Sequence, residues 1–147
     1  MKTIIVYFTF GGSTKKEAER LAAELGATLY RVREARNRSF FGSFLPGAYL
    51  AMHHKAVNIQ PLDINLQNYD RIIIGCPVWA GNPAPAFNAI VELLPAGKEV
   101  ELFFCSGGSG TQKSEKGTRA LIEKKGCTIV SYRDVKTGVP PGKMKND

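Results

Sequence analysis

Residues 1–25 read MKTIIVYFTFGGSTKKEAERLAAEL, and this stretch decides the fold class. Lys2–Phe8 is a nearly continuous apolar run rich in β-branched residues, which is typical of a strand buried on both faces of a parallel sheet. Thr14–Leu25 spaces its apolar residues at helical intervals, with Thr14 and Glu17 in the positions of a capping box. A strand followed at once by an amphipathic helix predicts the first half of a βαβ unit.

The same alternation continues along the chain. Further runs rich in β-branched or aromatic residues predict strands at Thr28–Val32, Arg71–Cys76, Val100–Cys105 and Thr128–Val135. Further amphipathic stretches predict helices at Asn82–Leu94 and Ser114–Lys125. Right-handed crossovers then give an α/β, doubly wound parallel sheet with helices on both faces. Because ligands of such sheets bind at the carboxyl ends of the strands, we expect function in the loops after the first, third and fourth strands.

Two segments depart from this alternation. Residues 33–68 are too long for a simple loop, are basic and Phe-rich, and include a predicted short helix at Ala48–Lys55. After the last strand the chain carries only a polar tail, residues 138–147, so the final covering helix is expected to be missing. The bare side of the last strand would then be covered by the 33–68 segment or by a neighbouring subunit in a homodimer.

Composition excludes several classes of protein. The chain has 147 residues, 44% of them hydrophobic, which suits a single domain over 1–147. Its apolar runs are far shorter than the roughly 18 residues of a membrane span, and its start lacks an export signal, so we expect a cytoplasmic protein. Cys76, Cys105 and Cys127 lack the close spacing of a zinc or redox site and are predicted to be reduced thiols.

The charge is basic and uneven. Lys and Arg number 20 against 13 Asp and Glu, a net charge of +7, and the stretch Arg31–Lys55 is strongly basic. No helix-turn-helix, zinc-finger or RNA-recognition signature accompanies this charge, so nucleic acid is not the expected partner. A basic surface that attracts an anionic ligand or an acidic partner is the favoured interpretation.

The first loop, residues 9–15, has the composition of a phosphate cradle. Its Gly-Gly pair lets the backbone approach an anion, the following helix presents N–H groups, and hydroxyls add donors. The loop lacks both the dinucleotide glycine fingerprint and the spacing of a nucleotide triphosphate loop, so a monophosphate ester fits better. The alternative is a plain Gly-Gly turn with an ordinary Thr cap.

The second and third loops suit a flat ligand. The second loop, residues 77–83, contains Trp79, the only tryptophan, which either packs on the core or faces an aromatic ligand. The third loop, residues 105–111, has few side chains and could recognise a polar ring edge through backbone N–H groups, although a flexible connector has the same composition.

Other chemistries fit less well. A cysteine phosphatase with Cys105 as nucleophile would need an arginine about six positions later, where Thr111 stands. A phosphate-accepting receiver domain would need carboxylates in the first two loops, which have none. His53 and His54 are adjacent on a predicted helix, point in different directions and do not predict a metal site.

In order and spacing, the three loops resemble the flavin-binding loops of the flavodoxin-like family. The resemblance covers nearly the whole chain, is closest to the short flavodoxin family proteins, and implies strand order 2-1-3-4-5 and bound FMN. By this resemblance the phosphate is held by the first loop, the isoalloxazine by the second and its pyrimidine edge by the third. The implied cofactor-binding residues are Thr9, Gly11, Gly12, Ser13, Thr14, Pro77, Val78, Trp79, Ala80, Gly81, Cys105, Ser106, Gly107, Gly108 and Gly110.

Three features depart from the family pattern. Gly11 stands where the family carries a Thr, so one phosphate hydroxyl is lost. Ala80 stands where flavodoxins often have Gly, and the peptide flip that stabilises a flavin semiquinone passes through positive φ, which a Cβ disfavours unless Gly81 takes that role. The third loop lacks the aromatic residue that stacks on the flavin in many flavodoxins, which leaves one ring face open.

The expected function is therefore electron transfer by an FMN-binding flavoprotein, with an anionic redox partner protein or small-molecule acceptor. The first alternative is an FMN-dependent NAD(P)H:quinone-type oxidoreductase. The second is a flavin-free binding module on the same fold. No metal and no catalytic side chain is predicted.

Overall fold

The structure is a computed structural model that describes residues 1–35 and 57–137. Its strands are β1 (Thr3–Tyr7), β2 (Thr28–Arg31), β3 (Arg71–Trp79), β4 (Asn82–Pro83), β5 (Glu99–Ser106) and β6 (Thr128–Lys136). Its helices are α1 (Ser13–Leu25), the short 3₁₀ helix η1 (Leu66–Asn68), α3 (Pro85–Glu92) and α4 (Glu115–Lys124). All five predicted strands are present.

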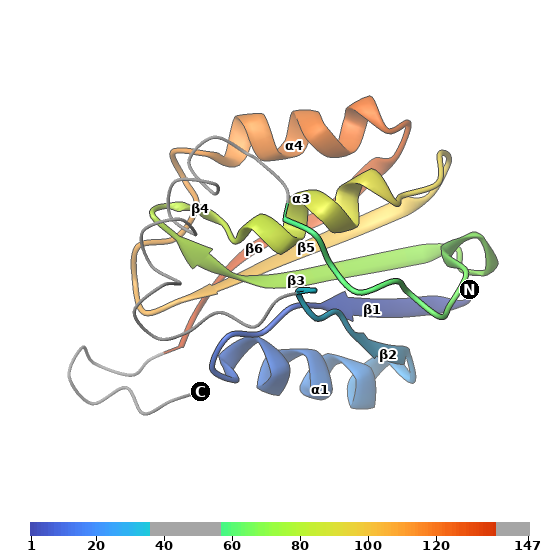
Figure 1. Ribbon diagram of the computed structural model, residues 1–147, viewed down its shortest axis with the longest axis horizontal. Helices are drawn as coiled ribbons and strands as arrows, with labels where there is room; N and C mark the ends of the chain where they lie inside the picture. The colour runs from blue at the N-terminus through green and yellow to red at the C-terminus, as the bar shows by residue number, and fades with distance from the viewer. Residues whose placement is uncertain (36–56, 138–147) are drawn as a thin grey trace.

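The sheet has the predicted topology. Its order is β2-β1-β3-β5-β6, and every neighbouring pair on this path is parallel. In order of the five predicted strands this is 2-1-3-4-5. Helix α1 lies on one face of the sheet, whereas α3 and α4 lie on the other (Figure 1). The carboxyl ends of β1, β3 and β5 consequently meet at one edge.

Alternating side chains divide the core into two layers. Ile4, Val6 and Phe8 pack with residues of α3 and α4 on one face, whereas Ile5 and Tyr7 pack with residues of α1 on the other. All five side chains are at least nine-tenths buried. This two-sided burial is the physical reason for the continuous apolar runs in the sequence.

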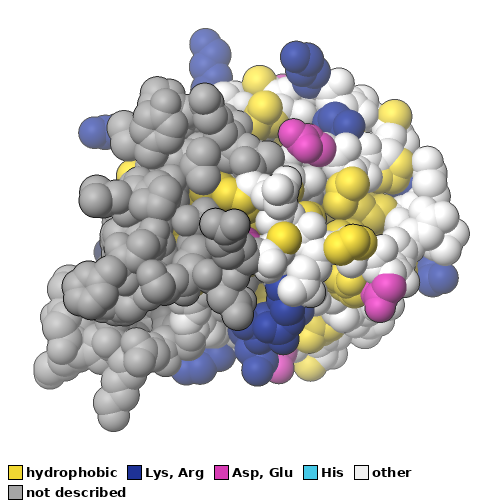
Figure 2. All heavy atoms as spheres, viewed as in Figure 1, with side chains coloured by type: hydrophobic (Ala, Val, Ile, Leu, Met, Phe, Trp, Pro, Cys, Tyr) yellow, Lys and Arg dark blue, Asp and Glu magenta, His cyan; other side chains and the backbone are white. Residues whose placement is uncertain are grey.

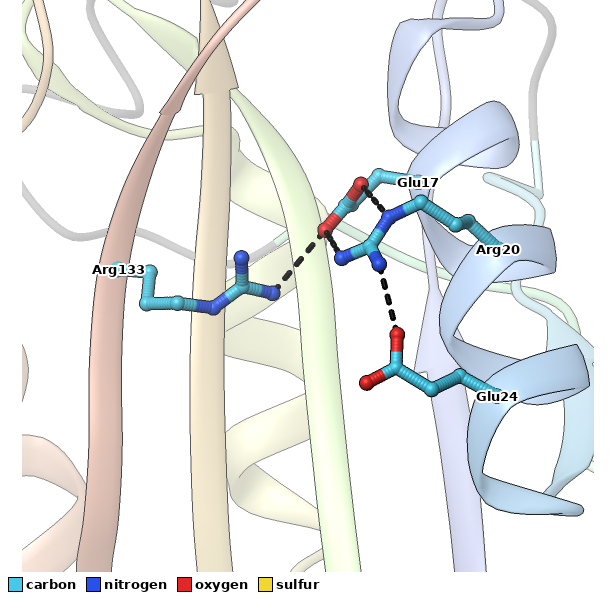
Figure 3. A network of polar contacts seen from close by, with 4 residues as sticks. All are labelled: Glu17, Arg20, Glu24 and Arg133. Atoms are coloured by element: carbon cyan, nitrogen blue, oxygen red, sulfur yellow. Dashed lines mark hydrogen bonds and ion pairs between the residues drawn. The ribbon is translucent and has the colours of Figure 1, made fainter.

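On the α1 face, an ion-pair network covers the last two parallel strands (Figure 3). Arg133 of β6 reaches across to Glu17 of α1, with 3.1 Å between Nη2 and Oε2. The same carboxylate accepts two hydrogen bonds from Arg20, which also pairs with Glu24. The Arg133 guanidinium lies 5.9 Å from the ring centroid of Phe103. Part of the side predicted to be bare is thus covered by charged side chains from within the chain.

Glu17→Gln is expected to lower the free energy of unfolding by about 1 kcal/mol at neutral pH. Hydrogen bonds from Arg20, and secondly from Arg133, lower the pKa of the Glu17 carboxyl. A lowered folded-state pKa contributes stability that is present above the unfolded pKa, near 4.5, and is lost as the pH falls through the folded value. Urea unfolding at pH 7 and pH 3 measures this, since the difference between the two proteins should shrink at pH 3. An equal difference at both pH values would contradict the assignment.

Three local predictions are corrected. Thr14 and Glu17 do not form a capping box, because α1 begins one residue earlier and its N-cap is Gly12, without a side-chain cap. Helix α3 begins at Pro85, not at Asn82, because Asn82–Pro83 pairs with β3 as the short antiparallel strand β4. Strand β3 runs on to Trp79 through part of the predicted second loop.

Some predictions lie outside the described residues. These are the helix at Ala48–Lys55 with His53 and His54, most of the basic stretch, and the tail 138–147. In the described part of the 33–68 segment, Ile59 forms an antiparallel bridge with Glu34, and the chain then reaches η1. No helix within residues 1–35 and 57–137 is long and apolar enough to cross a membrane.

Candidate functional site

The three loops come together at the carboxyl edge of the sheet. The ring centroids of Phe10, in the first loop, and Trp79, in the second, are 5.5 Å apart. The Ser114 hydroxyl, just after the third loop, donates to the Gly81 carbonyl over 2.9 Å. Segments about 70 and 33 residues apart in sequence thus form one site.

The first loop has the geometry of an anion site. Gly11 and Gly12 have φ of 148° and 124°, values that side chains rarely adopt. The first intrahelical hydrogen bond of α1 runs from Lys16 N–H to the Gly12 carbonyl, so the preceding N–H groups face the loop. The first turn of α1 contains no acidic residue. The positive end of the helix dipole is therefore not neutralised by the helix itself.

Thr9 supplies a second, independent observation at this site. The residue is 8% exposed, and its Oγ1 is buried without a hydrogen-bond partner among the described residues. A buried hydroxyl without a partner costs about 1–3 kcal/mol, so native proteins rarely leave one unless a ligand or water satisfies it. Thr9, the Gly-Gly turn and the α1 N-terminus thus bring together the kinds of donor that a small anion requires.

The second loop is a tight β-hairpin. Trp79 pairs with Asn82, which leaves Ala80 and Gly81 as the two turn residues, with φ of 53° and 75°. Positive φ at both central residues is the requirement of a type I′ turn. The Asn82 side chain supports the turn by donating from Nδ2 to the Ala80 carbonyl over 2.9 Å. Ala80 therefore has positive φ in this structure, without any peptide flip. The backbone strain that its Cβ causes is present before the flip that accompanies semiquinone formation in flavodoxins.

Ala80→Gly is expected to leave the free energy of unfolding unchanged or to raise it by up to about 1 kcal/mol. Relief of the left-handed strain is worth about 1–2 kcal/mol, partly offset by the greater freedom of glycine in the unfolded chain. Ala23→Gly, at an exposed position within α1, makes the same chemical change and should cost about 1 kcal/mol. Thermal unfolding of both variants and the unmodified protein measures this: the unfolding temperature should fall in Ala23→Gly and should stay the same or rise in Ala80→Gly. Equal losses would show that the turn at Ala80 is not strained.

Trp79 lies between the first loop and the core. Its ring meets Phe8 and Phe10 edge to face, with centroid distances of 6.2 and 5.5 Å. Trp79 and Val78 are partly buried and pack against the larger core cluster, while Phe10 is 41% exposed. The three rings thus form a row of contacts that runs from buried Phe8 through Trp79 to exposed Phe10, and the exposed part of this row can contact a flat ligand.

The third loop is held by side chains at both ends. Ser106 Oγ accepts hydrogen bonds from the N–H groups of Gly108 and Gly110, at 3.4 and 3.1 Å. Thr111 is fully buried and is bonded to Asp134 of β6. Cys105 and Ser106 both lie in β5, and the Cys105 side chain packs in the core cluster on the α1 face instead of facing the loop edge.

Comparison with known proteins identifies the fold. No family model matches the chain. It is 26% identical over 133 residues to an uncharacterised protein of Archaeoglobus fulgidus, covering 90% of this chain and 84% of that one. A flavoprotein of Lactobacillus acidophilus, solved in complex with FMN, is 25% identical with a TM-score of 0.69, covering 90% of this chain and 92% of that chain.

Two further solved structures agree in fold. A candidate flavoprotein of Bacteroides uniformis is 24% identical with a TM-score of 0.79, covering 92% of this chain and 90% of that chain. Oxidised flavodoxin 1 of Bacillus cereus is 14% identical with a TM-score of 0.55, covering 92% and 86%. The chain has a flavodoxin-like fold.

In this flavodoxin-like fold, the loops predicted from the sequence do adjoin one another, but some organising residues were missed. Phe8, Ser114 and Asp134 each contact a loop residue and were not predicted to do so, and Asn82, within the predicted second loop, was not singled out there. Asn82 alone carried a local signal, since Asn two residues after a turn position commonly bonds to the turn backbone. The others act through the tertiary structure.

A separate hollow of about 640 Å³ lies outside the three loops. It is lined by Ile59, Gln60, Pro61, Leu62, Ile64, Asn65, Leu66, Gln67, Leu93 and Pro95. Hydrophobic side chains gather on this side of the molecule, right of centre in Figure 2. The lining offers no charged group, and we assign it no part in the candidate site.

Proposed function

We propose that this protein binds FMN at the three loops and carries electrons. The observation that carries the proposal is the unpartnered, buried hydroxyl of Thr9 beside the Gly-Gly turn and the α1 N-terminus. These donors lie between β1 and β3, the switch point at which ligands bind in sheets of this strand order. The FMN complex of the Lactobacillus acidophilus flavoprotein supports the proposal.

Each loop has a distinct role in this proposal. Thr9, Ser13 and Thr14, with the Gly11–Gly12 backbone, bind the phosphate. Residues 77–81 flank the isoalloxazine, with Trp79 against one face or edge, and Ser106–Gly110 meet the pyrimidine edge through backbone N–H groups. When bound, FMN supplies a ring system that accepts one or two electrons. The chain orients that ring and limits its exposure to water.

Titration with FMN, FAD and riboflavin tests the proposal. FMN should bind at least about 100-fold more tightly than riboflavin, because a dianionic phosphate gains several charge-assisted hydrogen bonds in the first loop. Fluorescence of Trp79, the only tryptophan, should be strongly quenched as FMN saturates. Equal affinity for riboflavin would remove the phosphate role of the first loop. Unchanged tryptophan emission at saturation would remove Trp79 from the ring site.

A reductase is the second candidate, favoured by one feature of the third loop. Residues 105–112 contain no aromatic side chain that could cover a flavin ring, so nicotinamide or quinone could stack there. Oxidation of NADH or NADPH by the FMN-loaded protein, with a quinone as acceptor, tests this. If neither nicotinamide is oxidised, the reductase is excluded and the carrier remains.

The charge at the loop edge favours an anionic partner or acceptor. Lys15, Arg33, Lys113 and Lys136 are exposed at this edge. Acidic residues at the same edge are engaged with neighbours, as for Glu115 with Arg119 and Asp134 with Thr111. Long-range attraction would then speed association with an acidic redox protein, and its rate should fall with added salt. We also propose a cytoplasmic setting, because the three cysteines are buried and free.

A further inference from the structure

Thr111 forms hydrogen bonds with two side chains of β6, those of Asp134 and Tyr132, although it was not among the predicted site residues. It is fully buried, and its N–H and hydroxyl both donate to Asp134 Oδ1, at 3.0 and 2.7 Å. Tyr132 brings its hydroxyl to within 2.6 Å of Thr111 Oγ1. Because the single Thr111 hydroxyl hydrogen points at Asp134, Tyr132 must donate to Thr111. Burial raises the pKa of Tyr132 to about 12, which keeps that proton in place at neutral pH.

Asp134 and, separately, Ser106 engage some amides of the third loop and leave others available. Asp134 takes the N–H of Thr111, and Ser106 takes those of Gly108 and Gly110. Gly107 and Ser109 are exposed, and their N–H groups have no acceptor within the described residues. Alternate N–H groups are therefore bound by the protein, while those between them remain free for a ligand.

The same network reaches the second loop. Ser114 lies at the start of α4 and is 9% exposed. Its N–H donates to the Thr111 carbonyl at 3.0 Å, and its hydroxyl lies within hydrogen-bond distance of two carbonyl oxygens, that of Gly81 at 2.9 Å and that of Thr111 at 3.2 Å. A chain of hydrogen bonds thus runs from Asp134 on the edge strand, through Thr111 and Ser114, to the strained Ala80–Gly81 turn.

We propose that Asp134 is a positioning residue of the flavin site: through Thr111 and Ser114 it sets the third loop and the second-loop turn at a fixed separation. The proposal rests on the proposed function, because it concerns the two loops assigned to the isoalloxazine. No described hydrogen bond links this network to the phosphate loop, so we expect its effect to fall mainly on the ring part of the ligand.

Two pairs of variants separate the hydrogen bonds from side-chain bulk. Asp134→Ala removes the acceptor, whereas Asp134→Asn keeps an oxygen that can still accept both bonds from Thr111. Thr111→Val removes the hydroxyl at similar volume, whereas Thr111→Ser keeps it. Asp70→Ala is the matched control: its carboxylate accepts a hydrogen bond from Lys2 N–H before β3, at the other end of the sheet.

All variants and the unmodified protein are titrated with FMN and with riboflavin. Asp134→Ala and Thr111→Val should each bind both flavins about tenfold more weakly. In these variants the third loop is less ordered in the free protein, and the free energy needed to order it on binding lowers the affinity. The FMN-to-riboflavin ratio should stay constant. Asp134→Asn, Thr111→Ser and Asp70→Ala should stay within about twofold of the unmodified protein. In the flavin-free protein, the amides of Gly110 and Thr111 should exchange faster in Asp134→Ala.

The outcomes are separable. Binding of neither flavin by the unmodified protein would overturn the proposed function and this inference together. Normal binding by the unmodified protein with unchanged affinities in Asp134→Ala and Thr111→Val would overturn the inference alone. The inference would also be overturned if the variants lost affinity for FMN but not for riboflavin, because the effect of Asp134 would then be on phosphate binding. A purely structural role would lower the unfolding temperature of Asp134→Ala while leaving both affinities unchanged, and would also overturn it.

Discussion

Gly75→Ala is expected to destabilise the protein by about 3 kcal/mol or more, a large share of the roughly 5–15 kcal/mol by which folded domains are ordinarily stable. A Cβ at Gly75 would lie 2.0 Å from Phe103 Cζ and 2.5 Å from both Cε atoms, far inside contact distance. Phe103 is fully buried and cannot withdraw, because Ala18 and Leu21 of α1 pack in the same cluster and Arg133 lies over its ring. Urea unfolding followed by far-UV circular dichroism measures the loss.

A double variant tests the stated cause of this loss. Gly75→Ala combined with Phe103→Leu removes the ring that the new methyl group meets, so the double variant should be less destabilised than the sum of its single variants. Phe103→Leu alone should cost about 1–2 kcal/mol through the cavity that it leaves. Simple additivity would show that the cost at Gly75 arises in the backbone and not at the ring.

The sheet could be predicted from the sequence because burial on both faces imposes a strong pattern. Ile4–Tyr7 of β1 and Leu102–Cys105 of β5 are apolar and buried on consecutive residues, as strands covered on both faces must be. The C-terminal end of α1 was equally well marked, since Gly26 adopts φ 64° as the left-handed cap.

The errors concern places where local preferences are overridden. The β3–β4 hairpin needs positive φ at Ala80, which an alanine does not signal. Pro83 lies in the first turn of the predicted Asn82–Leu94 helix, where proline favours a helix start over a strand. The capping box at Thr14 failed because Gly12, at φ 124° and ψ −10°, begins the helix earlier. In both cases the loop conformation at the site, not helix or strand propensity, decides the local structure.

For the candidate site, the sequence predicted the three loops but not the side chains that support them. Gly-Gly and Gly-rich turns after buried strands are visible in one sequence, as is a single tryptophan beside them. The partner of Thr111 is not visible, because Asp134 is 23 residues away on an edge strand and nothing in its sequence neighbourhood marks it. Such side-chain contacts depend on strand register, here Phe104 against Asp134, which the sequence does not specify to one residue.

Gly12→Ala is expected to weaken FMN binding by about 100-fold while leaving riboflavin binding nearly unchanged. Gly12 is the N-cap of α1, and a Cβ at φ 124° is strained whatever space surrounds it. Relief of that strain would rotate the turn and redirect the N–H groups that precede the first helical hydrogen bond at Lys16. Loss of two charge-assisted hydrogen bonds to a phosphate corresponds to about 3 kcal/mol, or about 100-fold in affinity. Isothermal titration with both flavins measures it.

Gly26→Ala is the matched control at the other end of the same helix. Gly26 has φ 64° and no atom within 4 Å of the added Cβ, so the substitution strains the backbone without a clash. It should cost about 1 kcal/mol of stability and leave both flavin affinities unchanged, because the C-terminus of α1 lies away from the loop edge. Equal loss of FMN affinity in both variants would mean that helix stability, not the geometry of the Gly11–Gly12 turn, governs binding. Parallel loss of riboflavin and FMN in Gly12→Ala alone would move the phosphate away from the first loop.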